Sequence, residues 1–200
     1  MAKLKLTKNE LKKQKDALKM FKRYLPTLML KKQQLQAEIR SVELRVKELR
    51  AEKTRMDESF KSWIAVFGER NVFTPGLLKI TKLLASEGNI AGVPIPVFKG
   101  AEFEVEPYSL ILKPLWLDAA VESMKKVLLI DLEAETMEEQ QRRLERELRT
   151  TTQRVNLFEK VKIPECKRNI KKIQVYLGDE QTAAVVRGKI SKRAMERVAS

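Results

Sequence analysis

The chain has 200 residues, with 41 Lys or Arg, 27 Asp or Glu and a formal net charge of +14. It contains no histidine and one cysteine, Cys166, so an internal disulfide and a multi-cysteine metal site are excluded and the commonest general base is missing. Charged residues make up 34% and aromatic residues 6%, a balance typical of long helices. No apolar run reaches the roughly 18 residues of a membrane span, so we expect a cytoplasmic protein.

The positive charge is concentrated at the two ends of the chain. Residues 1–34 carry eleven Lys or Arg against two acidic residues, and residues 160–200 carry eleven against four. If the chain folds back once, these ends lie side by side and form one basic tip. Such a tip suits nucleic acid, an anionic membrane surface or an acidic protein cavity.

The first third of the chain shows a seven-residue apolar repeat. Seventeen positions, three and four residues apart in turn from Leu11 to Phe67, hold fourteen apolar side chains. A repeat of this length predicts a left-handed coiled coil over residues 1–67. Lys32 and Lys53 also occupy repeat positions. Their stems are expected to reach solvent or, alternatively, to fix the register or contact a third component.

The ends of this first helix carry local signals. Thr7 followed by Glu10 has the spacing of a capping box, which predicts the N-terminus. Gly68 predicts the C-terminus. Pro26 removes one helical hydrogen bond. Because the repeat stays in phase on both sides of this proline, we expect a kink and not a break.

Residues 68–115 have a different pattern and are predicted to form a small head. Thr74 and Pro75 suit the start of a short helix that stops near Gly88. Its apolar residues are Leu77, Leu78, Ile80, Leu83 and Leu84.

The rest of the head is predicted to be a β-hairpin. Its alternating apolar residues are Val93, Ile95 and Val97 in one strand and Phe103 and Val105 in the other. The turn is placed at Lys99–Gly100. Pro94 and Pro96 cannot donate hydrogen bonds, so the first strand pairs along one edge only. The hairpin is expected to lean on the short helix or on a partner.

Residues 116–200 are predicted to form the second coiled-coil helix and a basic tail. A heptad frame is filled by Trp116, Ala120, Val127, Ile130, Ala134, Met137, Leu144, Leu148, Val155 and Phe158. After Pro164 the apolar residues sit one position later than this frame predicts: Cys166, Ile170, Ile173 and Leu177. This shift predicts altered winding near the proline. The predicted fold is therefore mainly α, with two very long antiparallel helices that form a left-handed coiled coil and a central head of a short helix and a hairpin.

Catalytic motifs are missing from the sequence. Gly188-Lys189-Ile190-Ser191 lacks the upstream glycine and the hydroxyl that a phosphate-binding loop needs. No nucleophile is paired with a base. We therefore expect no enzyme activity, no cofactor and no metal.

The C-terminal half contains a distinctive series of residues. They are Arg154-Val155-Asn156-Leu157-Phe158-Glu159, Ile163-Pro164, then Ile170, Ile173 and Leu177, and Arg187-Gly188-Lys189 with Lys192. This series resembles a signature of the D subunits of the V-type ATPases. The N-terminal residues Leu6-Thr7, Leu11, Leu18, Leu28, Lys31 and Leu35 are similar to the same family's opening run. Together these matches cover both long helices.

The resemblance implies a central-stalk rotor of an ATP synthase or ion pump. In that family the paired helices enter a ring of catalytic A and non-catalytic B subunits. The F subunit binds lower on the stalk, and the head docks on a funnel-like subunit above the membrane rotor ring. ATP is hydrolysed or made only by the A/B ring, and rotation drives proton or sodium transport. The resemblance thus implies that the chain is cytoplasmic and peripheral to the membrane, as part of the ATPase complex.

We predict that the ring contacts the basic tip. Its residues are Lys3, Lys5, Lys8, Lys12, Lys13, Lys15, Arg187, Lys189, Lys192 and Arg193. A tip that is merely solvated is the alternative for these residues. For the whole chain, the alternatives are a prefoldin-like coiled-coil chaperone and a basic coiled coil that binds nucleic acid. Duplex DNA binding with a steep salt dependence would favour the last of these.

Overall fold

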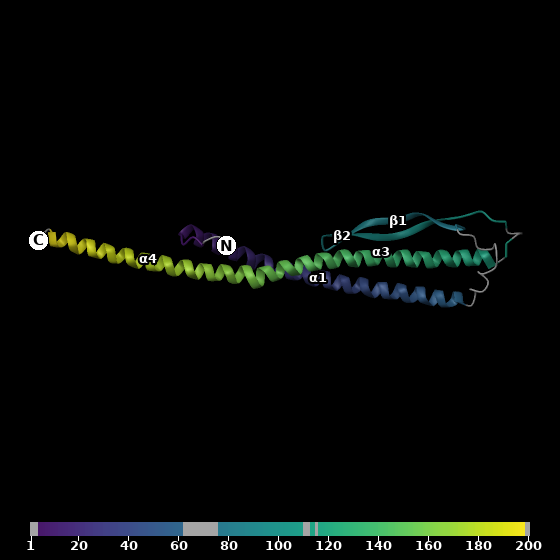
Figure 1. Cartoon of the computed structure of the whole chain (residues 1–200), viewed down its shortest axis with the longest axis horizontal. Helices are drawn as coiled ribbons and strands as arrows, with labels where there is room; N and C mark the ends of the chain where they lie inside the picture. The colour runs from purple at the N-terminus through teal and green to yellow at the C-terminus, as the bar shows by residue number, and fades with distance from the viewer. Residues whose placement is uncertain (1–3, 62–75, 110–112, 115, 199–200) are drawn as a thin grey trace. The chain divides into compact units, whose positions relative to one another are not determined.

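The computed structural model describes residues 4–61, 76–109, 113–114 and 116–198 of the chain (Figure 1). Its elements are α1 (Lys8–Lys61), β1 (Leu78–Ile90), β2 (Val93–Val105), α3 (Trp116–Asn156), the π-helix η1 (Leu157–Lys162) and α4 (Ile163–Val198). The mainly helical fold with one hairpin agrees with the sequence-based prediction. The chain divides into two compact units. Unit 1 is Met1–Lys32 with Thr150–Ser200, and unit 2 is Gln33–Arg149.

Helix α1 begins where the capping signal places it. The Glu10 backbone N–H donates to Thr7 Oγ1 at 3.3 Å, and the Leu11 N–H donates to the Thr7 carbonyl at 3.0 Å. These bonds satisfy backbone donors that the first turn leaves free. The helix continues through Pro26 without a break. The predicted end at Gly68 lies outside the described residues.

In unit 1, α1 pairs with η1 and α4 in the antiparallel sense. Asn169 Nδ2 donates to Gln14 Oε1 at 3.4 Å. The rings of Phe21 and Phe158 lie 4.9 Å apart, centre to centre, and are tilted by 53°. The partner's number falls as the α1 number rises, as antiparallel helices require. Edge-tilted aromatic contacts of this kind add to the apolar burial along the seam.

The predicted change of winding near Pro164 is confirmed and takes the form of η1. This π-helix ends directly before Ile163 and the proline, and the Ile163 N–H donates to the carbonyl of Phe158, five residues earlier. An α-helix bonds four residues back, so η1 holds one more residue per turn. The extra residue explains why the apolar positions after Pro164 come one residue late.

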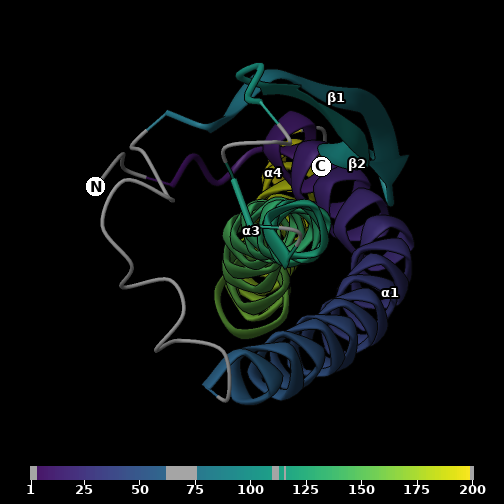
Figure 2. The ribbon, with the colours of Figure 1, turned by 90° about the vertical axis from the view of Figure 1, so that its right-hand side faces the viewer.

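In unit 2, the core lies between α1, α3 and the tip half of the hairpin. Its buried residues are Leu35, Ile39, Val42, Val46, Val93, Ile95 and Leu144. The α1 members follow the predicted heptad, since Leu35, Ile39, Val42 and Val46 are three or four residues apart. The hairpin runs alongside α3 in Figures 1 and 2. The head therefore leans on the long helices of its own chain.

A second apolar cluster holds the base of the hairpin. Leu77, Leu117 and Val121 are buried there, with Val105 and Tyr108 packed against them. The Glu106 N–H donates to the Leu77 carbonyl at 2.9 Å and closes the open end of the two strands. The start of α3 thus fixes where the hairpin begins.

The predicted short helix that stops near Gly88 is wrong over its apolar residues from Leu78 to Leu84. This segment is the first half of β1, which pairs with β2 in the antiparallel sense from Leu78 opposite Val105 to Ile90 opposite Val93. Thr81 is an extra residue between two paired positions, and such a bulge breaks the two-residue alternation. The apolar residues Ile80 and Leu83, one on each side of the bulge, are three residues apart in the sequence. This spacing also fits a helix. The predicted helix start at Thr74–Pro75 lies outside the described residues.

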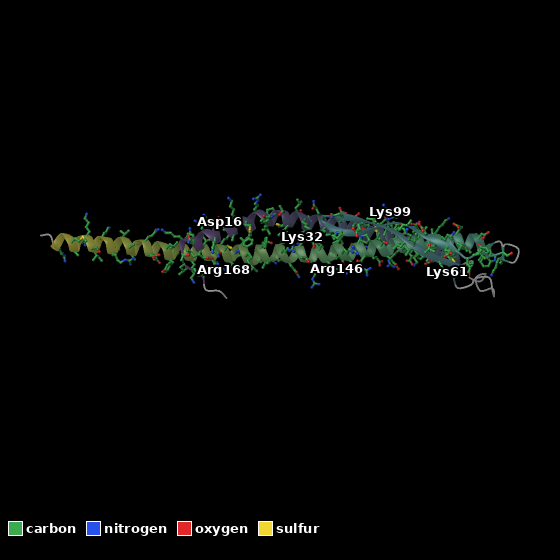
Figure 3. All side chains as sticks on the ribbon, turned by 90° about the horizontal axis from the view of Figure 1, so that it is seen from above. Asp16, Lys32, Lys61, Lys99, Arg146 and Arg168 are labelled. Carbon is green, nitrogen blue, oxygen red and sulfur yellow. The ribbon has the colours of Figure 1, made fainter. Side chains whose placement is uncertain are left out.

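The predicted turn at Lys99–Gly100 is also wrong. The turn is Ala91–Gly92, where both residues have positive φ (51° and 79°) and Asn89 Oδ1 accepts the Gly92 N–H at 2.9 Å. Lys99, labelled in Figure 3, is an extra residue within β2, next to Gly100 with φ of 145°. The glycine serves a bulge and not a turn. Alanine is unusual at positive φ, so the real turn gave no clear signal.

Candidate partner-binding surface

The predicted basic residues all belong to unit 1. Lys3 lies outside the described residues, and the other nine are exposed: Lys5, Lys8, Lys12, Lys13, Lys15, Arg187, Lys189, Lys192 and Arg193. Lys5 precedes α1, the next four lie in its first two turns, and the last four lie near the end of α4. An exposed basic surface of this kind attracts an acidic partner at long range.

The structure does not bring the two basic groups into one cluster. Helix α4 runs on past the first turn of α1, as Figure 1 shows within unit 1. From Gly178 to Met195 every described side chain is exposed. The N-terminal lysines thus flank the paired part of unit 1, and Arg187 to Arg193 belong to a single projecting helix. The prediction of one compact tip is corrected to two successive basic stretches.

The projecting end of α4 also exposes apolar side chains. These are Val185, Val186, Ile190 and Met195, with exposed fractions from 49% to 74%. Val175 and Tyr176 are exposed at the edge of the paired part. Large apolar side chains that are exposed to water next to arginine are typical of a surface that binds another protein.

Unit 2 is reinforced by ion pairs between its two helices. Arg45 Nη2 lies 2.9 Å from Glu133 Oε1, Lys53 Nζ lies 2.7 Å from Asp131 Oδ1, and Arg50 pairs with Glu138. The hydrogen bond from Arg45 to Glu133 raises the pKa of Arg45 above its ordinary value. Lys53 was predicted either to extend its stem to solvent or to fix the register or contact a third component. Its ion pair with Asp131 favours a role in the register of the helices.

A cleft of about 480 Å³ separates part of the hairpin from α3. Leu83, Ala85 and Pro96 form one wall, and Leu132, Glu135, Thr136, Glu138, Glu139, Arg142 and Arg143 form the other. The Arg143 side chain donates to Glu139, and this bond holds the pKa of Glu139 below its ordinary value. The charged side chains of this wall are therefore largely paired with one another or with α1.

Sequence reasoning missed the contacts that attach β2 to α3. Gln140 Nε2 donates to the Pro96 carbonyl at 2.6 Å, and Arg143 Nη1 donates to the Pro94 carbonyl at 3.4 Å. The only signal was Pro94 and Pro96 themselves, which mark a strand edge that cannot donate but can still accept. Their partners lie more than forty residues away in sequence, so no local pattern identifies them.

Groups suited to chemistry are scarce in the described part of the chain. Among those residues no three His, Cys, Asp or Glu side chains are grouped to hold a metal ion. None of the described helices is both long and apolar enough to cross a membrane. Cys166 is buried, and burial raises the pKa of its thiol.

Two antiparallel helix pairs, a docked hairpin and a projecting basic helix end define a mainly helical protein built on long paired helices. The model of the family of ATP synthase D subunits matches residues 10–193. The chain therefore belongs to the ATP synthase D-subunit family.

Named relatives cover nearly the whole chain. The D subunit of the V-type ATP synthase of Borreliella burgdorferi is 51% identical over 195 residues, which span 98% of this chain and 96% of the relative. Proteins of the same name from Chlamydia trachomatis serovar L2 and Chlamydia muridarum are 36% and 35% identical, and each match spans 96% of both chains.

Proposed function

We propose that the chain is the central rotor shaft of a V-type ATP synthase or ATPase. It couples ATP hydrolysis or synthesis in a ring of A and B subunits to rotation of a membrane ring and to transport of protons or sodium ions. The shaft catalyses no reaction itself. It works on the cytoplasmic side, peripheral to the membrane.

The single observation that carries this proposal is the projecting end of α4 in a chain of this family. A helix that leaves its partner and exposes Val185, Val186, Ile190 and Met195 together with Arg187 and Lys189 is unstable in water by itself. Burial inside a protein ring removes those side chains from water, at roughly 25 cal/mol for each Å² of apolar surface. The ring is the partner that the family resemblance provides.

Rotation follows from differential binding. Each closed A/B interface favours one orientation of the shaft, and successive closure around the ring favours successive orientations. The ion pairs of unit 2, such as Arg45 with Glu133, resist relative sliding of α1 and α3. The F subunit and a funnel-like subunit are the further partners that link the shaft to the membrane ring.

A reversible crosslink tests the proposal. The chain is co-expressed with A and B subunits as Cys166→Ala with Lys189→Cys, and a cysteine is placed on the inner face of the ring. Oxidation should stop ATP hydrolysis and reduction should restore it, because a rotor tied to its ring cannot turn. The matched control is Cys166→Ala with Lys189→Ser, in which the shaft has no thiol that could form the crosslink to the ring cysteine. Hydrolysis that continues at full rate in a crosslinked complex contradicts the proposal.

A further inference from the structure

The buried positions on the second long helix of unit 1 shift by one residue across η1. Thr151 and Val155 are buried before η1, and Cys166 and Ile173 are buried after it. Val155 and Cys166 are eleven residues apart in the sequence. In an uninterrupted heptad repeat, the core position that corresponds to Cys166 would lie ten residues after Val155. Cys166 and Ile173 are again seven apart. The burial pattern therefore contains one added residue, located between Val155 and Cys166.

The backbone shows where that residue is absorbed. In η1 the Ile163 N–H reaches back five residues to the Phe158 carbonyl. One residue in an α-helix turns the chain by about 100°, because a full turn takes 3.6 residues. A π-turn takes up one residue locally, so the helix beyond it keeps the orientation it would have without the insertion.

Pro164 explains why the wide turn lies at this position. In a regular α-helix its ring would crowd the carbonyl of Lys160, and its missing N–H would leave that carbonyl without a partner. A π-turn just before the proline moves the preceding carbonyls away from the ring. The extra residue therefore lies where the proline already makes a regular α-helix energetically unfavourable.

We propose that η1 is a phase-setting joint. It absorbs one inserted residue so that Cys166, Ile170, Ile173 and Leu177 face α1, and it thereby fixes the direction in which the basic residues Arg187 to Arg193 point. The second part rests on the proposed function, because that direction matters only if a ring contacts those residues.

Two single-residue deletions test the joint, both made in the full chain carrying Pro164→Ala so that proline strain is the same in each. Lys160 lies within η1 and Lys171 lies in α4, and both are exposed lysines. Deleting Lys160 removes the inserted residue and leaves a regular α-helix whose seam is in phase on both sides. Deleting Lys171 leaves either Cys166 and Ile170 or Ile173 and Leu177 facing away from α1.

We expect the deletion of Lys160 to change the thermal midpoint by less than about 3 °C and the deletion of Lys171 to lower it by on the order of 10 °C. A short bis-maleimide joining Gln14→Cys to Asn169→Cys, in a Cys166→Ala background, reports the orientation of α4. Crosslinking should persist after deletion of Lys160. The proposal that η1 sets the phase of α4 is overturned if the two deletions destabilise the chain equally, or if the crosslink is lost in the Lys160 deletion.

A third variant separates the joint from the proposed function. One alanine inserted between Gly178 and Asp179 turns the basic end of α4 by about 100° and leaves the paired seam unchanged. In the complete ATPase reconstituted with its membrane ring in vesicles, this variant should lose coupling of hydrolysis to pumping, whereas the Lys160 deletion should keep it. Full coupling in the insertion variant refutes the role of the direction, and the stability result for η1 is unaffected. Failure of the chain to assemble with the ring at all would instead refute the proposed function.

Discussion

Gln140 of α3 donates a hydrogen bond from its side-chain Nε2 to the carbonyl oxygen of Pro96 in β2, and the two atoms lie 2.6 Å apart. Gln140 is only 4% exposed, although it is polar. Proline cannot donate to a further strand, so this edge of β2 offers acceptors alone. The glutamine satisfies one of them and joins the head of the molecule to its long helix.

Replacement of Gln140 by methionine should destabilise the chain by about 1–3 kcal/mol, because the side chain keeps its approximate size but leaves the Pro96 carbonyl without its donor. The free energy of unfolding is measured by urea titration. Gln141→Met is the matched control, since Gln141 bonds to the exposed Glu145 on its own helix. We expect that control to change stability by less than about 0.5 kcal/mol. Equal effects of the two substitutions would contradict a structural role for the Gln140 bond.

The helical part of the fold is predictable from the sequence because its signals are local. Thr7 with Glu10 marks the start of α1, and a shift in the apolar frame at Pro164 marks η1. Each of these two signals depends only on residues that are a few positions apart in the sequence.

The head was predicted less well because its structure depends on pairing between distant residues. The bulge at Thr81 gives β1 the spacing of a helix, and Ala91 occupies a turn position that usually takes Asn or Gly. The Gln140 contact cannot be predicted from a single sequence. The predicted basic residues are exposed as expected. However, α4 continues further past the paired region than α1 does, and this difference in length could not be read from the apolar repeat.

Gly88 lies where the two strands approach closely, and its replacement by alanine should destabilise the hairpin. A Cβ atom at this position would lie 2.8 Å from Val97 Cγ2 and 3.4 Å from Ile95 Cγ1. Val97 is branched at Cβ and has little freedom to move. We expect a loss of about 1–3 kcal/mol in the free energy of unfolding.

Gly178→Ala is the contrasting substitution for the same residue type. Among the described residues, no atom beyond the neighbouring stretch of the same helix lies within 4 Å of the Cβ that it would add, and the site is helical and exposed. Alanine favours the helix by about 1 kcal/mol over glycine, so the far-ultraviolet circular dichroism signal should become more helical. If both glycine substitutions reduce helicity and stability alike, the packing around Gly88 is not the cause of its effect.

The ion pair between Lys53 and Asp131 should contribute modestly and lose strength in salt. Their side chains are 33% and 40% exposed, so solvent screens the attraction. A double-mutant cycle with Lys53→Ala and Asp131→Ala should give a coupling free energy of about 0.2–1 kcal/mol. The value should fall in about 0.5 M salt. A coupling that does not depend on salt would indicate packing by the lysine stem in place of charge.

Cys166 should react slowly with alkylating reagents in the folded protein. Burial raises the pKa of the thiol, and the charge of Glu165 raises it further, while Lys162 acts in the opposite direction. A raised pKa leaves less thiolate at a given pH, so the rate should keep increasing above the pH at which an exposed thiol levels off. At pH 8 we expect iodoacetamide to react at least about tenfold more slowly than with Ala184→Cys in a Cys166→Ala chain. Urea should abolish the difference, and equal rates in the folded state would show that the thiol is accessible.

Charge reversal at the end of α4 should uncouple ATP hydrolysis from ion pumping if the ring pushes on this segment. The variant carries Arg187→Glu, Lys189→Glu and Arg193→Glu, all at exposed positions of unit 1. The control carries Lys47→Glu, Arg55→Glu and Lys61→Glu, which change the net charge equally at exposed positions of α1 in unit 2. Charges within about 10 Å of the ring surface are felt at 0.1 M salt, so only reversals that face the ring should act. In reconstituted vesicles, the ratio of ions pumped to ATP hydrolysed should fall several-fold in the first variant and stay near the wild-type value in the second.

An unchanged ratio in the first variant would mean that the basic end is merely solvated. An equal fall in both variants would point to net charge and not to a contact at Arg187 to Arg193.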